Sequence, residues 1–203
     1  MLDDLLTTFI TFFTVIDPIG TVPVFIAVTS AYSKSEKKKI ALKAALVASG
    51  VLLFFIVLGE VILDAIDIPL PTFQIAGGIV LFIFALSMIF GESKPESEIS
   101  DIDKKDDKAI FPLAMPSLAS PGAILAAILL TENSENSVTD QSLTTLMMLL
   151  VMIIAWIFMT LSTTIFKYIG NSGAAIISRV MGLILSAVAV DNVLQGIRFY
   201  FEI

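Results

Sequence analysis

The stretch FFTVIDPIGTVPVF, residues 12–25, places one aspartate, two prolines and a glycine inside an apolar run. Proline lacks a backbone N–H and disfavours a helical residue before it, so a helix through this run should break between Ile16 and Pro18. A charge and freed backbone groups inside an apolar segment must be buried in protein or face a wet cavity, because lipid cannot satisfy them. The role of the stretch therefore depends on the chain around it.

The composition is that of a membrane protein. The chain has 203 residues, of which 57% are hydrophobic and only 15% charged, against roughly 25% charged in soluble domains. Six apolar stretches are long enough to cross a hydrocarbon core of about 30 Å. We therefore predict an all-α membrane protein, one integral membrane domain over residues 1–203, with six transmembrane helices at about 5–31, 40–63, 70–91, 110–131, 143–169 and 174–199.

Several classes of chemistry are disfavoured by what the sequence lacks. It contains neither cysteine nor histidine, which removes thiol redox chemistry, the commonest soft-metal ligands and the usual general base. The HExxH and GxGD motifs of intramembrane proteases do not occur. We expect no enzymatic activity, no cofactor, no metal site and no nucleic-acid partner.

The basic residues predict an orientation in the bilayer. All except Arg198 fall at the first, third and fifth connections between spans, and such connections lie in the cytoplasm by the positive-inside rule. Both termini should then lie outside the cell, with the chain as a multi-pass protein of the cytoplasmic membrane. The basic residues at these three connections are Lys34, Lys37, Lys38, Lys39, Lys43, Lys94, Lys104, Lys105, Lys108, Lys167 and Arg179.

The two halves of the chain resemble each other. A charged stretch, residues 92–109, is predicted to be a flexible cytoplasmic linker between a first three-span repeat, 1–91, and a second, 110–203. Pro18 aligns with Pro121 at a separation of 103 residues, and Gly78 aligns with Gly182 at a separation of 104. Because each half has an odd number of spans, the second enters the membrane from the opposite side. We therefore predict an inverted 3+3 repeat with broken helices one and four, the plan of many transporters.

Each predicted break has the residues that start a helix. Asp17 with Pro18, and Ser120 with Pro121, place a capping residue before a proline at the first helical position. The freed N–H groups and the positive end of each half-helix would favour an anionic group such as a carboxylate. A substrate site at the membrane midplane follows, formed by Asp17, Pro18, Ile19, Gly20, Thr21, Ser120, Pro121, Gly122 and Ala123.

Further residues have more than one interpretation. Gly77 and Gly78 either leave a small substrate cavity beside the broken span or allow close helix packing. Asp17 has three possible roles: it caps a kinked helix, contacts a substrate ammonium group or carries a coupling proton. Because an ionisable residue at membrane depth is costly, a functional role is favoured. Asp191 in the sixth span is a second coupling candidate.

Four motifs, in this order and spacing, carry a resemblance that covers nearly the whole chain: DPIGTVPVF, FQIAGGIVLFIFALSM, FPLAMPSLASPGAI and SRVMGLILSAVAV. With them the sequence resembles the MarC family of six-span membrane proteins, also described as small neutral amino acid transporters. The resemblance implies an integral transporter of the cytoplasmic membrane for substrates of the glycine and alanine class. Two positions depart from the usual pattern of the family, which has Asn at Thr21 and Gly at Ser120.

The expected function is therefore secondary transport of a small neutral amino acid by alternating access, coupled to a proton or a sodium ion. The alternative is a small-ion or proton channel or exchanger that uses Asp17 and Asp191. A membrane scaffold is disfavoured by the short loops. The sequence leaves open whether the chain forms an oligomer.

Overall fold

The computed structural model describes residues 2–90, 108–133 and 136–201, and its regular elements within these residues are helices. Most of the predicted linker, 92–109, lies outside the described residues. The all-helical membrane architecture predicted from composition is confirmed. The helices are α1 (Leu2–Ile16), α2 (Thr21–Val28), α3 (Lys34–Ala65), α4 (Leu70–Phe90), η1 (Ala109–Leu118), α6 (Pro121–Leu129), α7 (Val138–Thr160) and α8 (Ser162–Phe201).

Six stretches of the described chain are long and apolar enough to span a membrane. Four are single helices, a fifth covers α1 and α2 over Asp4–Val28, and the sixth is the pair η1 and α6, bent by 56° at the break between them. The predicted boundaries of the fifth span were wrong, since it ends at Thr160 instead of residue 169. The chain then continues into α8, which bends at Gly170, where a positive φ of 64° suits a residue without a side chain.

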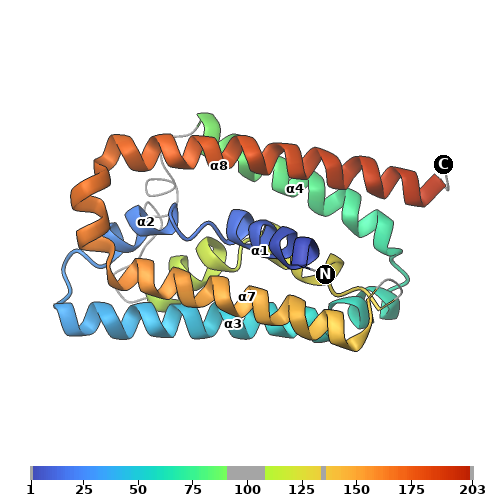
Figure 1. Ribbon diagram of the computed structural model, residues 1–203, viewed down its shortest axis with the longest axis horizontal. Helices are drawn as coiled ribbons and strands as arrows, with labels where there is room; N and C mark the ends of the chain where they lie inside the picture. The colour runs from blue at the N-terminus through green and yellow to red at the C-terminus, as the bar shows by residue number, and fades with distance from the viewer. Residues whose placement is uncertain (1, 91–107, 134–135, 202–203) are drawn as a thin grey trace.

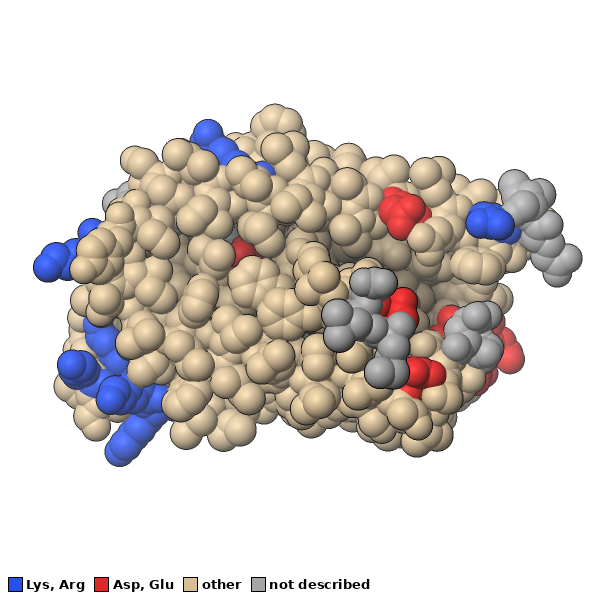
Figure 2. Space-filling view, viewed as in Figure 1, with Lys and Arg blue, Asp and Glu red and all other residues tan. Residues whose placement is uncertain are grey.

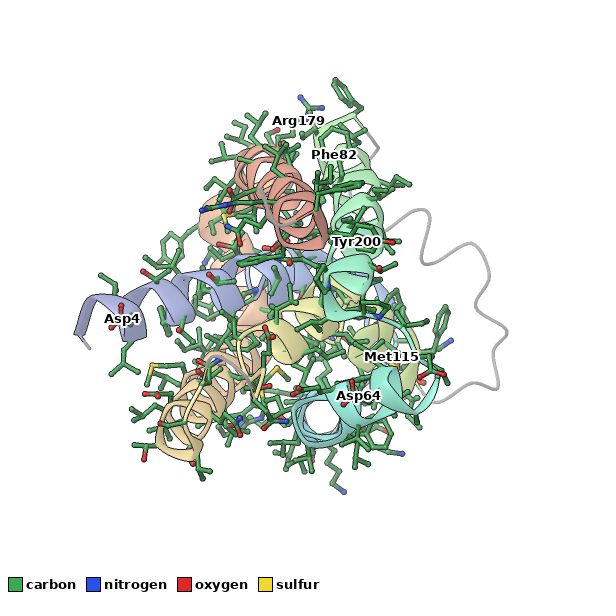
Figure 3. The ribbon with its side chains drawn as sticks, turned by 90° about the vertical axis from the view of Figure 1, so that its right-hand side faces the viewer. Asp4, Asp64, Phe82, Met115, Arg179 and Tyr200 are labelled. Carbon is green, nitrogen blue, oxygen red and sulfur yellow. The ribbon has the colours of Figure 1, made fainter. Side chains whose placement is uncertain are left out.

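The helices form three layers (Figures 1 and 3). In one outer layer α4 packs against α8, and in the other α3 packs against α7. The two interrupted segments, α1 with α2 and η1 with α6, lie between them. Each interrupted segment packs on the two outer-layer helices that come from the other half of the chain. Helices α1 and α2 pack on α7 and α8, and η1 and α6 pack on α3 and α4. The interruptions are thereby held in the interior.

The first part of the fourth span is not the regular half-helix that the sequence predicted. Within η1, Phe111 and Met115 have extended backbones, with φ of −124° and −132°. Each precedes a proline, and a proline pushes the residue before it out of the helical region. Two such steps within five residues leave an irregular, wide coil, so only α6 is a regular half-helix in this span.

Capping residues define where α3 and α7 begin. The Ser33 side chain accepts from the Glu36 N–H while the Glu36 carboxylate accepts from the Ser33 N–H. Ser137 and Asp140 repeat this reciprocal pair at the start of α7. Such capping boxes satisfy backbone donors that a helix start leaves open. Helices α3 and α7 therefore start with the same capping box, one in each half of the chain.

Small residues set the packing of α4 on α8. A Cβ built on Gly78 would lie 2.9 Å from the Ala189 carbonyl oxygen, and one built on Gly182 would lie 3.0 Å from the Ala85 carbonyl oxygen. The two helices run antiparallel (Figure 1) and touch at backbone level. Small residues permit such close approach in membranes, where dispersion contacts drive helix association.

Most basic side chains lie toward one end of the long axis and most acidic ones toward the other, where a basic side chain also lies near the C-terminus (Figure 2). Lysines gather over the start of α3, at what we call the lysine end. Arg179 points outward from α8 (Figure 3). The opposite end holds Asp64 and Asp67 at the α3–α4 connection and Glu132 after α6. The surface between the two ends carries many exposed apolar side chains, as expected of a lipid-facing surface.

Candidate functional site

The break in the first span begins where the sequence predicted it. Helix α1 ends at Ile16, and Asp17 takes a left-handed backbone with φ of 49°. Among residues with a side chain, aspartate and asparagine adopt this conformation most readily. The side chain of Asp17 is 1% exposed, and its Oδ1 accepts a hydrogen bond from the Gly20 N–H at 2.9 Å.

The predicted start of the second half-helix was wrong in its position. Regular helix begins at Thr21 with Gly20 before it, whereas Pro18 and Ile19 form a turn. The left-handed backbone of Asp17 differs from the extended conformation that an N-cap residue usually takes. The hydrogen bond from the Gly20 N–H to Asp17 closes this turn, and α2 itself begins without a side-chain cap. A Cβ on Gly20 would overlap the Asp17 carboxylate, so the turn requires a glycine here.

The break in the fourth span has the predicted form. Ser120 has an extended backbone and its hydroxyl accepts from the Ala123 N–H at 3.1 Å. Pro121 occupies the first turn of α6, where its missing N–H costs nothing. Ser120 is therefore the N-cap residue of α6, as its position before Pro121 predicts.

The two breaks are joined by side-chain hydrogen bonds. The Ser120 hydroxyl donates to the Val15 carbonyl oxygen at 2.8 Å, across 105 residues of sequence. The Thr21 and Ser117 hydroxyl oxygens lie 3.3 Å apart. Because Thr21 donates its only hydroxyl proton to the Asp17 carbonyl oxygen, Ser117 is the donor in this pair. Thr21 and Ser120 thus both link the breaks.

These polar groups are inside the molecule. Thr21, Ser117 and Ser120 are fully buried and Asp17 is nearly so. Burial of a polar group is costly unless it is hydrogen-bonded, and the contacts above supply partners for the three hydroxyl groups and for Oδ1 of Asp17. Figure 2 shows a small recess left of the middle of this face, with an acidic side chain at its bottom. The interior between the breaks is therefore a polar centre surrounded by apolar helices.

The predicted glycines have different neighbours. A Cβ on Gly77 would meet the end of the Leu125 side chain on α6, the second part of the broken span. A Cβ on Gly78 would instead meet the backbone of α8. Gly122 faces Leu81 of α4, and Ala123 is fully buried beside it. The structure thus brings Gly77 and Gly122 to the contact of α4 with α6, whereas Gly78 belongs to the contact of α4 with α8.

Asp191 is not brought together with the breaks. Its side chain is exposed on α8, and its Oδ2 accepts from the Gln195 amide at 2.7 Å, one turn further along the same helix. Asp191 and Asp17 thus differ in setting, one on the outer surface and one buried. Their shared acidity in the sequence carried no information about which face of a helix each would occupy.

Ser117 was missed from the sequence. It lies one helical turn before Ser120 and follows Pro116, so it is a polar residue in a segment already predicted to be broken. That position is a signal that could have identified it. Its contact with Thr21 depends on the packing of two segments 96 residues apart and could not be derived from local sequence.

A second polar cluster lies near the end opposite the lysines. One Glu60 carboxylate oxygen accepts from the Asn133 backbone N–H at 3.0 Å and from its side-chain amide at 2.6 Å. Gln141 donates to the Asn133 side-chain oxygen at 2.9 Å. These residues line a cavity of about 270 Å³, with Thr131 at the end of α6. The cluster joins α3 of the first half to the α6–α7 connection of the second.

Comparison with known proteins places the chain among membrane proteins. The family model described as MarC family integral membrane protein matches residues 2–201. The UPF0056 membrane protein MJ1677 of Methanocaldococcus jannaschii is 36% identical over 94% of both chains. A UPF0056 membrane protein of Aquifex aeolicus is 34% identical over 94% of this chain and 90% of its own length. YvbG of Bacillus subtilis is 30% identical over 96% and 94%. No solved structure matches.

Proposed function

The chain belongs to the MarC family of integral membrane proteins, and on this premise we propose that it is a secondary transporter of small neutral amino acids of the glycine and alanine class. The substrate binds at the membrane midplane between the breaks at Asp17 and Ser120. The protein acts by alternating access, with a proton or a sodium ion as the coupling ion. The chain lies in the cytoplasmic membrane with both termini outside.

The observation that carries the proposal is the meeting of two helix breaks in the interior. Broken backbone at membrane depth is tolerated where it is buried in protein or lines a cavity, and transporters place their substrate sites at such points. Asp17, Thr21, Ser117 and Ser120 bring polar side chains to the same place. A carboxylate can pair with a substrate ammonium group, while the start of α6 presents N–H groups toward a substrate carboxylate.

An inverted repeat would supply the two access states. Three features support it: reciprocal packing at Gly78 and Gly182, capping boxes at Ser33 and Ser137, and contact of each interrupted segment with the opposite half. The first two pairs are each separated by 104 residues, the offset of the sequence alignment. Rocking of one three-span unit against the other would open the breaks to each side in turn.

Proton or ion exchange is the second candidate, and one observation favours it. Asp17 is a buried carboxylate in the middle of a span, the setting of many proton relays. Asp191 is exposed on α8, away from the breaks. The exchanger function therefore depends on Asp17 alone of these two residues. The two candidates differ in whether an amino acid is moved.

Uptake by reconstituted protein tests the proposal. Purified full-length protein in liposomes should take up labelled glycine or alanine saturably, while large or charged amino acids should not compete. Movement of protons or sodium without any amino-acid dependence would favour the exchanger instead. Absence of saturable uptake for every small neutral amino acid, in protein shown to be folded, would overturn the proposal.

The Asp17→Asn variant tests the site itself. Asparagine keeps an oxygen that can accept from Gly20, so the turn should survive. Loss of a charged hydrogen bond to an ammonium group, about 1.5 to 3 kcal/mol, should weaken glycine binding roughly 10- to 150-fold. If Asp17 carries the proton, binding stays while uphill accumulation is lost. Unchanged binding and unchanged accumulation would reduce Asp17 to a structural cap.

A further inference from the structure

An apolar groove of about 410 Å³ runs between α3 and α7 on the outside of the molecule. Residues between Leu42 and Leu53 form one wall, and residues between Leu149 and Trp156 form the other. Gly50 leaves the groove open, since a Cβ built there would meet no atom within 4 Å. The groove is therefore a lipid-facing hollow in the outer layer formed by these helices.

The groove has the length of one leaflet. From Leu42 to Leu53 the helix makes eleven steps of about 1.5 Å, a rise of about 17 Å. This is close to half of a hydrocarbon core of about 30 Å. The groove begins past the lysines at the start of α3 and lies beside the second half of α7, so it is on the side of the lysine end in both helices. An acyl chain of a lipid in that leaflet matches its length and its apolar lining.

Two lysines continue the wall of the groove toward the headgroup region. Lys38 and Lys39 precede Leu42 by four and three residues, which places them on the same face of α3, one turn closer to the membrane surface. Both side chains are exposed. They belong to the lysine cluster over the start of α3 (Figure 2). Basic side chains at this depth attract anionic headgroups.

We propose that this groove binds one acyl chain of an anionic phospholipid, whose phosphate lies against Lys38 and Lys39. The apolar groove supplies affinity for the chain, and the lysines supply selectivity for the headgroup. The inference is independent of the transported substrate, because none of its residues belongs to the breaks. A second copy of this protein is the competing occupant, and the experiment separates the two.

Trp156 is a natural probe, since it lines the groove and is the single tryptophan of the chain. Full-length protein is reconstituted in phosphatidylcholine vesicles, to which phosphatidylglycerol or phosphatidylcholine brominated on the acyl chain is added. Bromine quenches tryptophan fluorescence on contact. We expect brominated phosphatidylglycerol to reach half-maximal quenching at a mole fraction about fivefold or more below that of brominated phosphatidylcholine.

Two variants test the two parts of the site. Gly50→Leu fills the groove and should abolish the difference between the two lipids, whereas Ala187→Leu, at an exposed position of α8, should preserve it. The double variant Lys38→Gln with Lys39→Gln should raise the half-quenching fraction of phosphatidylglycerol about fivefold or more, to that of phosphatidylcholine. Its matched control, Lys167→Gln with Arg179→Gln, removes the same charge from α8 and should leave the fraction unchanged.

Four outcomes would overturn the proposal. Equal quenching of the wild-type protein by both lipids would remove the headgroup preference, and an unchanged preference in folded Gly50→Leu would remove the groove. If Gly50→Leu does not fold, the lysine double variant decides the question. The site is rejected if this variant changes the half-quenching fraction of phosphatidylglycerol no more than the control pair does. Weak quenching by both lipids, together with a disulfide between two chains carrying Ile153→Cys, would assign the groove to a second copy.

Discussion

The Ser120 hydroxyl donates a hydrogen bond to the carbonyl oxygen of Val15 at 2.8 Å, and in this way the start of one half-helix holds the end of another. The same hydroxyl oxygen accepts from the Ala123 N–H, so one side chain both caps α6 and secures the last turn of α1. Because α1 ends at Ile16, the Val15 carbonyl is one of the acceptors that a helix end leaves open. The two breaks therefore stabilise each other.

Replacement of Ser120 by alanine should destabilise the protein. Ser120→Ala removes the cap of α6 and leaves the Val15 carbonyl without this donor, which together should lower the free energy of unfolding by about 1 to 3 kcal/mol. Denaturant unfolding in detergent measures the change. Ser186→Ala is the matched control, since Ser186 bonds within its own helix, to the Leu183 carbonyl, and should cost less than about 0.5 kcal/mol. Equal costs would refute the bridging role of Ser120.

Valine substitutions at Gly77 and Gly78 should have different effects, although the sequence suggested the same effect for both. A valine at Gly77 presses on the flexible end of Leu125, so the Gly77→Val protein should still fold. Glycine uptake should fall at least tenfold, because α6 is displaced. A valine at Gly78 presses on the backbone of α8, so Gly78→Val should not form a stable protein. Size-exclusion chromatography and liposome uptake distinguish these results. Normal uptake by Gly77→Val would separate this glycine from the site.

Reciprocal packing predicts matching costs at two distant positions. Gly78→Ala and Gly182→Ala each press a methyl group toward a carbonyl oxygen of the facing helix, that of Ala189 or Ala85, and should destabilise by similar amounts, about 1 to 3 kcal/mol. Gly50→Ala is the control, because its methyl group meets open space and alanine favours helix by about 0.5 to 1 kcal/mol. Unfolding measurements in detergent compare the three. A large cost at only one of the paired glycines would argue against a repeat.

The orientation is tested by labelling the termini. If the positive-inside rule applies to the lysine end, epitope tags at either terminus should bind antibody on intact cells, without permeabilisation. A tag at residue 100, within the predicted linker, should bind only after permeabilisation and serves as the control. Protection of both termini in intact cells would invert the topology. Opposite accessibility of the two termini would contradict the six-span arrangement.

Much of the fold was predictable because it depends on local composition. Apolar segments of membrane length fix the number of spans, and the prolines at 18 and 121 fix where two of them are interrupted, since a missing N–H acts on its own neighbours. The capping role of Ser120 followed for the same reason. The prolines at 112 and 116 also act locally, but their combined effect was underestimated, and the first part of the fourth span is an irregular coil instead of a half-helix.

The candidate site depended on contacts that local patterns do not encode. The sequence identified Asp17 and Ser120 as residues at the breaks, but only tertiary packing joined Ser120 to Val15 and Ser117 to Thr21. Likewise, two adjacent glycines in α4 differ by 100° around the helix axis, and only the positions of α6 and α8 determine what each one contacts.

The sequence by itself determined that this protein is an all-helical membrane protein with interrupted spans, because hydropathy, length and proline act over a few residues. The tertiary structure decided which polar groups are buried together and which face outward. Asp17 and Asp191 are both acidic residues in apolar spans, yet one is enclosed beside the opposite break and the other is exposed on α8. That difference depends on which face of each helix packs against a neighbour, which is a property of the assembled layers.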